Sequence, residues 1–444
     1  MRTIPRTTSD EKGVSKSSDA ARLQLQLKLG MQLMSGRPGL LGIVFMIMLA
    51  NKTFAFRVPG KFSFRKPDMH RLRAIQKPGE AKQKSRKDVI TQGLAALASG
   101  LTIVSTGSVQ ARVPSLNASG GLTGGQGKKT ILITGANSGI GLDASKKLAA
   151  AGHDVFVACR TLSKAKEAAR VSNAAGAFEC DLSSLSSVER LVEAWGNRPI
   201  DALCLNAGVA MSTSETMPHF TAEGFEETIG VNHFGHFLLA QKLLPNLEKS
   251  SLAHPRLVVT ASSVHDPSTP GGNVGPGATL GNLKGFTDFL EKGKRFEMVD
   301  GGSYSGDKAY KDSKLLNVLF TQEMSRRLLD RKSKVRCDCF SPGLIPSTGL
   351  FRSQNQLFVG LFNFFAVNVL GVGTTISEGG DCLVYMVEAP ELEDTSAVFL
   401  ATPPGKPKDL FSSQTISKEA QDTAKAQRVW DLSEKLLNKV MKAA

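Results

Sequence analysis

A short apolar run that ends in a glycine-rich turn and leads into a helical pattern sets the strongest limit on the fold of this chain. The run covers Lys129 to Thr134, and the turn reads Gly-Ala-Asn-Ser-Gly-Ile-Gly. Glycines in such a turn let the backbone bend sharply and approach a pyrophosphate bound at the N-terminus of the next helix. The spacing alone would also suit an ordinary loop, but the order strand, turn, helix is the context that the motif requires. The pattern predicts a dinucleotide site at Gly135, Asn137, Ser138, Gly139, Ile140 and Gly141.

Further strands alternate with helical patterns along the rest of the chain. Helices are expected up to about Ala151 and from Ser163 to Arg170. The expected strands are Asp154 to Ala158, Ala177 to Cys180, Asp201 to Leu205, Arg256 to Thr260 and Lys334 to Phe340. This alternation predicts an α/β fold with one Rossmann-like, doubly wound parallel sheet in a single domain.

The positive charge of the chain is confined to its N-terminal quarter. The net charge of the 444 residues is +15, but residues 1–125 hold 20 Lys and Arg against 6 Asp and Glu. Residues 126–444 hold 35 and 34, so the folded part is nearly neutral. A neutral body offers no electrostatic footprint for a phosphate backbone, and we therefore expect no nucleic-acid partner.

The N-terminal quarter has the composition of a targeting presequence. Residues 1–55 are signal-peptide-like, since a basic leader precedes an apolar run, Gly39 to Ala50, that is too short to span a bilayer. Residues 56–125 are transit-peptide-like, rich in Lys and Arg, and end in a glycine-rich linker, which leaves residues 126–444 as the catalytic domain. The arrangement, with Phe56 at the junction, resembles the two-part plastid presequence of algae with secondary plastids. The alternative interpretation of this quarter is a disordered basic tail on a cytosolic enzyme. The segment Val89 to Val104 could be a thylakoid-transfer signal, a membrane-surface helix or a plain helix, and its periodicity does not separate these.

Basic residues at the end of the second expected strand indicate which dinucleotide binds. In dinucleotide folds this strand end faces the adenosine ribose, where an acid binds the free hydroxyl and a base accommodates an extra phosphate. Arg160, with Lys164 nearby, therefore favours NADPH over NADH, and a solvated arginine is the alternative interpretation.

A tyrosine and a lysine one helical turn apart form the candidate catalytic pair. Tyr310 and Lys314 lie at the start of a long helical pattern, and a spacing of four places them on one face. An adjacent ammonium should lower the pKa of the phenol and let it donate a proton near neutral pH. Asn206-Ala207-Gly208 follows the fourth expected strand, in the order that such a site requires.

Together these motifs resemble the short-chain dehydrogenase/reductase family from about Lys128 onward. The resemblance implies catalytic roles for Asn232, Ser263, Tyr310 and Lys314. It also implies cofactor contacts from Asp181, Leu182, Asn206, Ala207, Gly208, Tyr310, Lys314, Pro342, Gly343 and Thr348.

A narrower resemblance is to the light-dependent NADPH–protochlorophyllide oxidoreductases. It rests on Gly272 to Leu283, within a long insertion between Ser263 and Tyr310, on Met298 to Lys314 and on Thr348 to Arg352. The tail from Ser417 to Leu436 also matches. It implies light-driven reduction of protochlorophyllide, or of another large apolar small molecule, in a plastid on the stromal side of the thylakoid membrane. The apolar segment Leu357 to Leu370 would then cover the substrate or touch the membrane surface, with ordinary core packing as the alternative. Assembly into a homo-oligomer stays open.

The chain departs from the pattern of that narrower family at several cysteines. Leu344, Leu316 and Leu205 stand where the family has Cys, and Cys159 alone matches. Two alternatives therefore remain: an NADPH-dependent reductase of a lipid-like or retinoid-like carbonyl or alcohol, and a redox-sensing or scaffold protein without catalysis.

We expect no metal site. His233 and His236 are three residues apart but have no acidic or Cys partner in the sequence to complete a ligand set, so packing is the favoured interpretation. Cys337 and Cys339 alternate along a strand and are expected to be buried.

Overall fold

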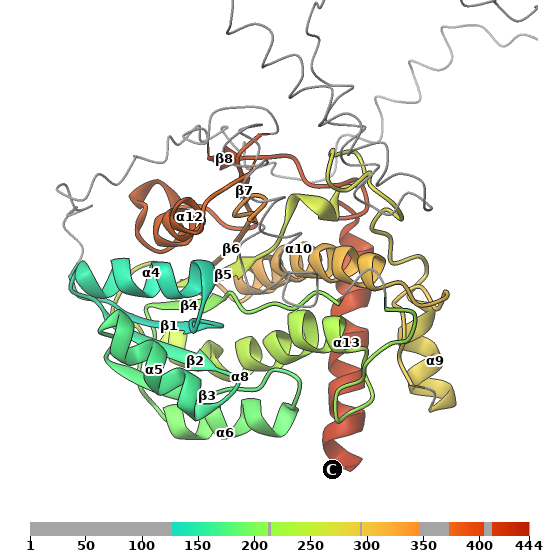
Figure 1. Cartoon of the computed structure of the whole chain (residues 1–444), viewed down its shortest axis with the longest axis horizontal. Coiled ribbons are helices and arrows are strands. Elements are labelled where there is room, and N and C mark those ends of the chain that lie inside the picture. Colours follow the sequence, from blue (N-terminus) through green and yellow to red (C-terminus); the bar gives the residue numbers. More distant parts are fainter. Residues whose placement is uncertain (1–126, 212–214, 294, 346–372, 404–410, 444) are drawn as a thin grey trace, which may run out of the picture. The chain divides into compact units, whose positions relative to one another are not determined.

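The computed structural model describes residues 127–211, 215–293, 295–345, 373–403 and 411–443 (Figure 1). Three features predicted from the sequence lie outside the described residues. They are the presequence, Thr348 and the apolar segment Leu357 to Leu370.

One mixed but mainly parallel sheet forms the centre of the described chain. Its strands are β1 (Thr130–Thr134), β2 (Asp154–Cys159), β3 (Gly176–Glu179), β4 (Ala202–Leu205), β5 (Arg256–Thr260), β6 (Arg336–Phe340), β7 (Phe399–Ala401) and β8 (Ser412–Ser413). They lie in the order β3-β2-β1-β4-β5-β6-β7-β8, and only β8 runs antiparallel to its neighbour. The order reverses direction between β1 and β4, which is where doubly wound folds bind ligands. The prediction of a doubly wound Rossmann-like sheet is confirmed.

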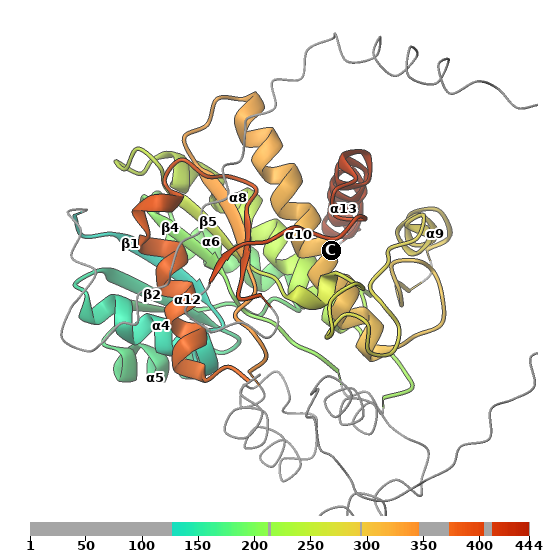
Figure 2. The same cartoon turned by 90° about the horizontal axis from the view of Figure 1, so that it is seen from above.

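Helices cover both faces of the sheet (Figures 1 and 2). One face carries α4 (Gly139–Ala150), α5 (Leu162–Ser172) and α12 (Ile376–Glu388), and the other carries α6 (Leu185–Trp195), α8 (His236–Glu248) and α10 (Gly306–Asp330). The short elements are α7 (Glu227–Ile229), a π-helix η1 (Gly230–Gly235), η2 (Ser263–His265) and η5 (Pro390–Leu392). Outside α10 lie α9 (Lys284–Lys292) and the last helix, α13 (Thr423–Ala443).

The first strand shows why the sequence forms this layered core. Ile131 and Ile133 are buried against the α4 and α12 side, whereas Leu132 is buried in the cluster on the opposite face. Alternate side chains of a strand point to opposite faces, so a strand buried on both sides reads as a continuous apolar run. This is the run that the sequence shows before the glycine-rich turn.

The last helix completes the core on the α8 and α10 side. The Trp430 ring stacks on Phe320 at 5.7 Å between centroids and lies 4.7 Å from the Phe237 ring. Ser433 of the same helix contacts His233 of η1, with Oγ and Nε2 2.9 Å apart. Among the described helices, none combines the length and the apolar content that a bilayer span requires.

Candidate active site

The glycine-rich turn and the loop after β4 are packed against each other at the sheet reversal. Gly135 has φ of +66°, and a side-chain Cβ placed there would lie 2.7 Å from the Ala207 Cα. A Cβ on Gly141 would lie 2.5 Å from the Asn206 amide nitrogen. Both positions therefore require glycine for close backbone approach.

The Thr134 hydroxyl connects these two loops. It accepts hydrogen bonds from the backbone N–H of Asn206 at 2.9 Å and of Ala207 at 3.0 Å. Asn206 returns a bond from its amide nitrogen to the Thr134 carbonyl at 2.9 Å. These bonds fix the position of the Asn206-Ala207-Gly208 segment relative to the end of β1.

His236 fixes the direction of the Thr134 hydroxyl. Its Nε2 lies 2.9 Å from Thr134 Oγ1, and its Nδ1 faces the Asn232 carbonyl oxygen at 3.4 Å. Burial lowers the pKa of His236 to about 3, so the ring is neutral. Since a carbonyl only accepts, the proton belongs on Nδ1, and the Thr134 hydroxyl donates to Nε2 in preference to the Cys204 carbonyl oxygen, which lies farther away at 3.3 Å. The lone pairs of Thr134 are then turned toward Asn206 and Ala207.

Tyr310 and Lys314 lie in the first turns of α10, as the spacing predicts. Ser305 caps this helix, its hydroxyl accepting from the Lys308 N–H at 3.3 Å. The Lys314 ammonium nitrogen lies 5.5 Å from the centroid of the Tyr310 ring and donates to the Thr260 carbonyl oxygen at 3.1 Å. The two side chains therefore share one helix face that looks onto the end of β5.

Asn232 and Gly208 complete the same cluster. The Asn232 side chain accepts from the Val209 N–H at 2.9 Å and donates to the Val209 carbonyl and to Ser313 Oγ, at 2.9 and 3.0 Å. A Cβ on Gly208 would lie 3.5 Å from Asn232 Oδ1 and 3.7 Å from Lys314 Nζ. The structure thus brings Asn232, Tyr310, Lys314 and the segment after β4 together.

Of the two adjacent serines, Ser262 acts on the Tyr310 phenol, and the catalytic role of Ser263 stays a prediction. A hydrogen bond from the Ser262 side chain lowers the pKa of Tyr310. Ser262 is the extended residue that precedes η2, whereas Ser263 begins the helical turn and gives its backbone N–H to Ser341 Oγ at 3.1 Å. Because the two serines are adjacent and alike, only the turn geometry decides which hydroxyl faces the phenol.

The expected effect of Lys314 on the pKa of Tyr310 is wrong for this structure. Burial raises the pKa of Tyr310 above its ordinary value, and the hydrogen bond with Ser262 offsets part of that rise. Burial also lowers the pKa of Lys314 to about 8, because the ammonium is removed from water. Desolvation outweighs the attraction that the spacing suggested.

Comparison with known proteins identifies the family. The family described as short chain dehydrogenase matches residues 129–291. A chloroplastic protochlorophyllide reductase from Daucus carota is 38% identical over 347 residues, which cover 76% of this chain and 86% of the relative. The chain belongs to the short-chain dehydrogenase family.

Further relatives of this short-chain dehydrogenase carry the same name as the carrot protein. A protochlorophyllide reductase from Avena sativa is 41% identical, covering 69% of this chain and 99% of the relative. Protochlorophyllide reductase A from Triticum aestivum, a chloroplastic protein, is 41% identical, covering 70% of this chain and 82% of the relative. This dehydrogenase is an oxidoreductase of the NADPH-dependent type.

The residues around the β1 turn fit a bound dinucleotide. Ser138 precedes α4 in an extended conformation, and its side chain makes no capping bond, so the first turn of the helix keeps its N–H groups for a phosphate. Arg160 directly follows β2 and is exposed, and Lys164 is exposed in the first turn of α5. Neither forms an ion pair with another described residue. Two free cations at this strand end suit the extra phosphate of NADPH.

The remaining predicted cofactor residues lie around the same edge of the sheet. Asp181 accepts from the N–H and the hydroxyl of Ser183, at 3.0 and 2.7 Å, and Leu182 is buried under Gly235. Pro342 and Gly343 follow β6, and Gly343 has φ of +90°. Their direct contact with a cofactor stays a prediction.

The three leucines at family cysteine positions differ in their surroundings. Leu205 and Leu316 are buried in the core cluster beside α8 and α10, while Cys204 packs on the opposite face of the sheet. Leu344 follows the Pro-Gly pair and is 40% exposed. Of the three, only Leu344 is exposed.

Sequence reasoning missed the roles of Thr134, His236 and His265. Their partners are distant in the sequence, so no local pattern reveals them. His265 faces the Ser262 carbonyl with Nδ1 at 2.8 Å and accepts from the Ser417 N–H at 3.2 Å. The described part of the chain gathers no group of three potential metal ligands.

Proposed function

We propose that this short-chain dehydrogenase reduces protochlorophyllide to chlorophyllide with NADPH in the light. The proposal is carried by relatives of that name, since the chain covers 86% of the Daucus carota protein and 99% of the Avena sativa protein. It is supported by the Tyr310, Lys314 and Asn232 cluster and by an insertion, Gly271 to Asp307, that lies between Ser262 and Tyr310.

In this reaction the double bond of one pyrrole ring gains a hydride at one carbon and a proton at the other. Bound NADPH would supply the hydride, which carries both electrons of the reduction. Tyr310 donates its phenolic proton to the second carbon, and water returns that proton to the phenolate. Ser262 holds the phenol oxygen by its hydrogen bond and stabilises the phenolate that forms.

Lys314 and Asn232 position the groups that surround Tyr310 during this proton transfer. The Lys314 ammonium, tied to the Thr260 carbonyl, faces the Tyr310 ring and binds the ribose of the cofactor. Asn232 joins the loop after β4 to Ser313 of the catalytic helix through its side-chain amide. Arg160 and Lys164 bind the phosphate that distinguishes NADPH.

We further propose the division of the chain into a presequence, residues 1–125, and a catalytic domain, residues 126–444. The chloroplastic relatives and the basic, acid-poor composition of residues 56–125 support delivery to a plastid, with the domain on the stromal side of the thylakoid membrane. A fluorescent fusion to residues 1–125 should enter the plastid, and diffuse cytosolic fluorescence would contradict this assignment.

A second candidate function is a dark NADPH-dependent reduction of a lipid-like or retinoid-like carbonyl. The exposed Leu344 favours it, because the thiol expected beside the nicotinamide loop is absent from this position. The deciding experiment mixes purified protein, NADPH and protochlorophyllide in the dark and compares absorption spectra before and after a flash. An NADPH-dependent conversion after the flash supports the first function. A silent protein at saturating pigment and cofactor, with carbonyl turnover in the dark, supports the second.

A further inference from the structure

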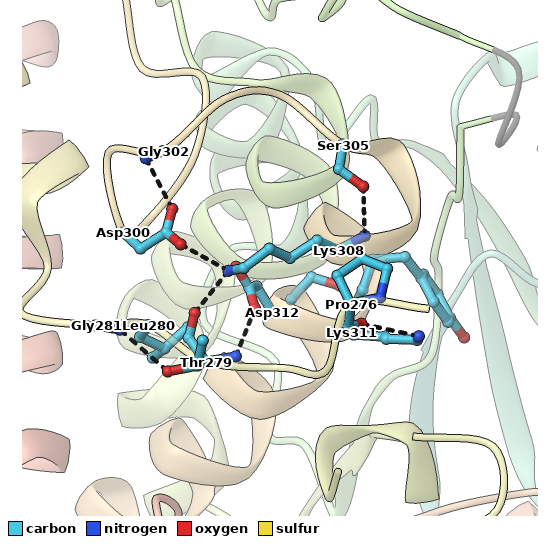
Figure 3. Close-up of polar contacts among 12 residues, drawn as sticks. Pro276, Thr279, Leu280, Gly281, Asp300, Gly302, Ser305, Lys308, Lys311 and Asp312 are labelled. Carbon is cyan, nitrogen blue, oxygen red and sulfur yellow. Dashed lines mark hydrogen bonds and ion pairs between the residues drawn. The ribbon is translucent and has the colours of Figure 1, made fainter. Parts of the chain in front are cut away.

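Charged side chains on both sides of Tyr310 turn away from solvent and toward the insertion (Figure 3). Lys308, Lys311 and Asp312 lie on the first turns of α10, where the Asp312 and Lys311 side chains are 0% and 4% exposed and the Lys308 side chain 13%. A charge is costly to bury unless its hydrogen-bonding groups are satisfied. The hydrogen-bond partners of these three side chains therefore indicate the structural role of the buried charges.

The Lys308 ammonium is satisfied by three oxygen acceptors. It donates to the Thr279 carbonyl at 2.7 Å and to Asp312 Oδ2 at 2.5 Å, and Asp300 Oδ2 lies 3.1 Å away. The other Asp312 oxygen accepts from the Thr279 N–H at 3.0 Å. Thr279 is thus held at both its N–H and its carbonyl by side chains of the catalytic helix.

The Lys311 ammonium is satisfied in the same way by a neighbouring part of the insertion. It donates to the carbonyl oxygens of Val274 and Pro276, the latter at 3.0 Å, and to Asp307 Oδ2 at 2.9 Å. An ammonium has three protons, so neither Lys308 nor Lys311 has one left for solvent. We call the segment from Val274 to Gly281, which carries these contacts, the strap.

The far half of the insertion has a different attachment. Phe286 and Phe289 of α9 are buried in a cluster with Phe225, Phe234 and Phe296. Lys439 of α13 donates to the carbonyl oxygens of Phe289 and Leu290 at the end of α9. Apolar burial therefore fixes α9. The strap has the buried side chains of Ala278 and Leu280 and a bond from the Leu280 N–H to Glu419, but its carbonyl groups at Val274, Pro276 and Thr279 are held by the two lysines.

We propose that Lys308 and Lys311 are positioning residues that hold the strap in register with Tyr310, so that the strap forms a fixed wall of the substrate site. This inference rests on the proposed function for the identity of the substrate. The lysines stand two residues before and one residue after Tyr310 on one rigid helix, so the strap and the phenol move together. The residues expected to bind the phosphates of the dinucleotide lie around β1, β2 and α4, and no expected cofactor residue belongs to the strap.

The test compares Lys308→Met and Lys311→Met with a matched control, Lys292→Met. Lys292 belongs to the same insertion, but its side chain is 49% exposed and pairs with Asp288 within α9. Asp312→Asn is a milder second variant, since the amide still accepts from Thr279 while losing its charge. Lys308→Arg keeps the charge and should restore the behaviour of the unaltered protein.

Three measurements follow on each variant: hydrogen exchange of the strap, the KM for protochlorophyllide together with the absorption maximum of the bound pigment, and the Kd for NADPH. A lost charge-assisted hydrogen bond is expected to speed exchange in the strap and raise the KM by about tenfold or more, with a shifted absorption maximum. The Kd for NADPH should stay within about twofold, and Lys292→Met should change none of these.

Unchanged hydrogen exchange in the strap would overturn the inference. A loss of NADPH affinity as large as the rise in KM would also overturn it, because such a loss indicates general damage to the fold. If the unaltered protein binds no protochlorophyllide, the proposed function fails. The exchange measurement then decides by itself whether the two lysines hold the strap.

Discussion

His233 offers a test of how strongly burial controls a titrating group in this fold. Its ring is 2% exposed on η1, and Nε2 meets Ser433 Oγ of α13 at 2.9 Å. Burial, assisted by repulsion from His236, lowers the pKa of His233 to about 3. The folded protein keeps the ring neutral, whereas the unfolded chain takes up a proton below the ordinary pKa of 6.5. Acid therefore favours the unfolded chain, and this contribution to stability is lost as the pH falls from about 6.5 toward 3.

The replacement His233→Gln removes the titration while an amide can still reach Ser433. Between about pH 7.5 and about pH 5, the linkage for one such group amounts to about 2 kcal/mol. The variant should be less stable than the unaltered protein at the higher pH, because the ring packs against Phe234 and Phe237. That stability deficit should shrink by about 2 kcal/mol at the lower pH.

Denaturant unfolding at the two pH values, followed by tryptophan fluorescence, measures this difference. Subtracting the variant from the unaltered protein cancels the other buried groups that titrate in this range, such as Asp312 and Glu226, whose burial raises their pKa to about 7. His219→Gln, whose side chain is 57% exposed, is measured alongside as a surface control. A stability difference for His233→Gln that is the same at both pH values would refute the argument from burial.

Four further predictions concern the active site. Tyr310→Phe should keep NADPH binding, measured by calorimetry, and lose about 100- to 10,000-fold in turnover, because only the donated proton is removed. Arg160→Ala should erase most of the preference for NADPH over NADH in the same titration, and equal affinities in the unaltered protein would contradict the role of Arg160. Because burial lowers the pKa of Lys314 to about 8, NADPH affinity should fall as the pH rises through that value, and a flat profile would argue against contact between its ammonium and the cofactor. Leu344→Cys should shift the absorption of bound protochlorophyllide and raise the yield per flash, whereas an unchanged spectrum would place residue 344 away from the pigment.

The sequence predicts the central part of the fold because its strands are continuous apolar runs. The expected Arg256 to Thr260 strand coincides with β5, and Asp154 to Ala158 is one residue short of β2. The strands β7 and β8 are missed, since three and two residues are too few to show a periodicity.

The candidate site is predictable where residue spacing alone decides it. A helical spacing of four brings Tyr310 beside Lys314, and the glycine turn follows β1 as expected. The choice between Ser262 and Ser263 depends on the conformation of one turn, which the residues do not encode locally. The direction of the pKa shift of Tyr310 depends on how much of the chain surrounds the phenol, and this quantity exists only in the folded protein.

The packing of α13 has a consequence for the order in which the molecule is made. The Trp430 ring packs on Phe237 and Phe320, and Ser433 contacts His233, but α13 leaves the ribosome after both α8 and α10. Until then these rings on α8 and α10 lack their cover, and such a nascent chain exposes an apolar surface of the kind that chaperones bind. The helix that carries Tyr310 therefore gains this support only after α13 has been synthesised. A chain interrupted before Trp430 would contain every residue of the proposed catalytic cluster and still lack the packing that holds them in place.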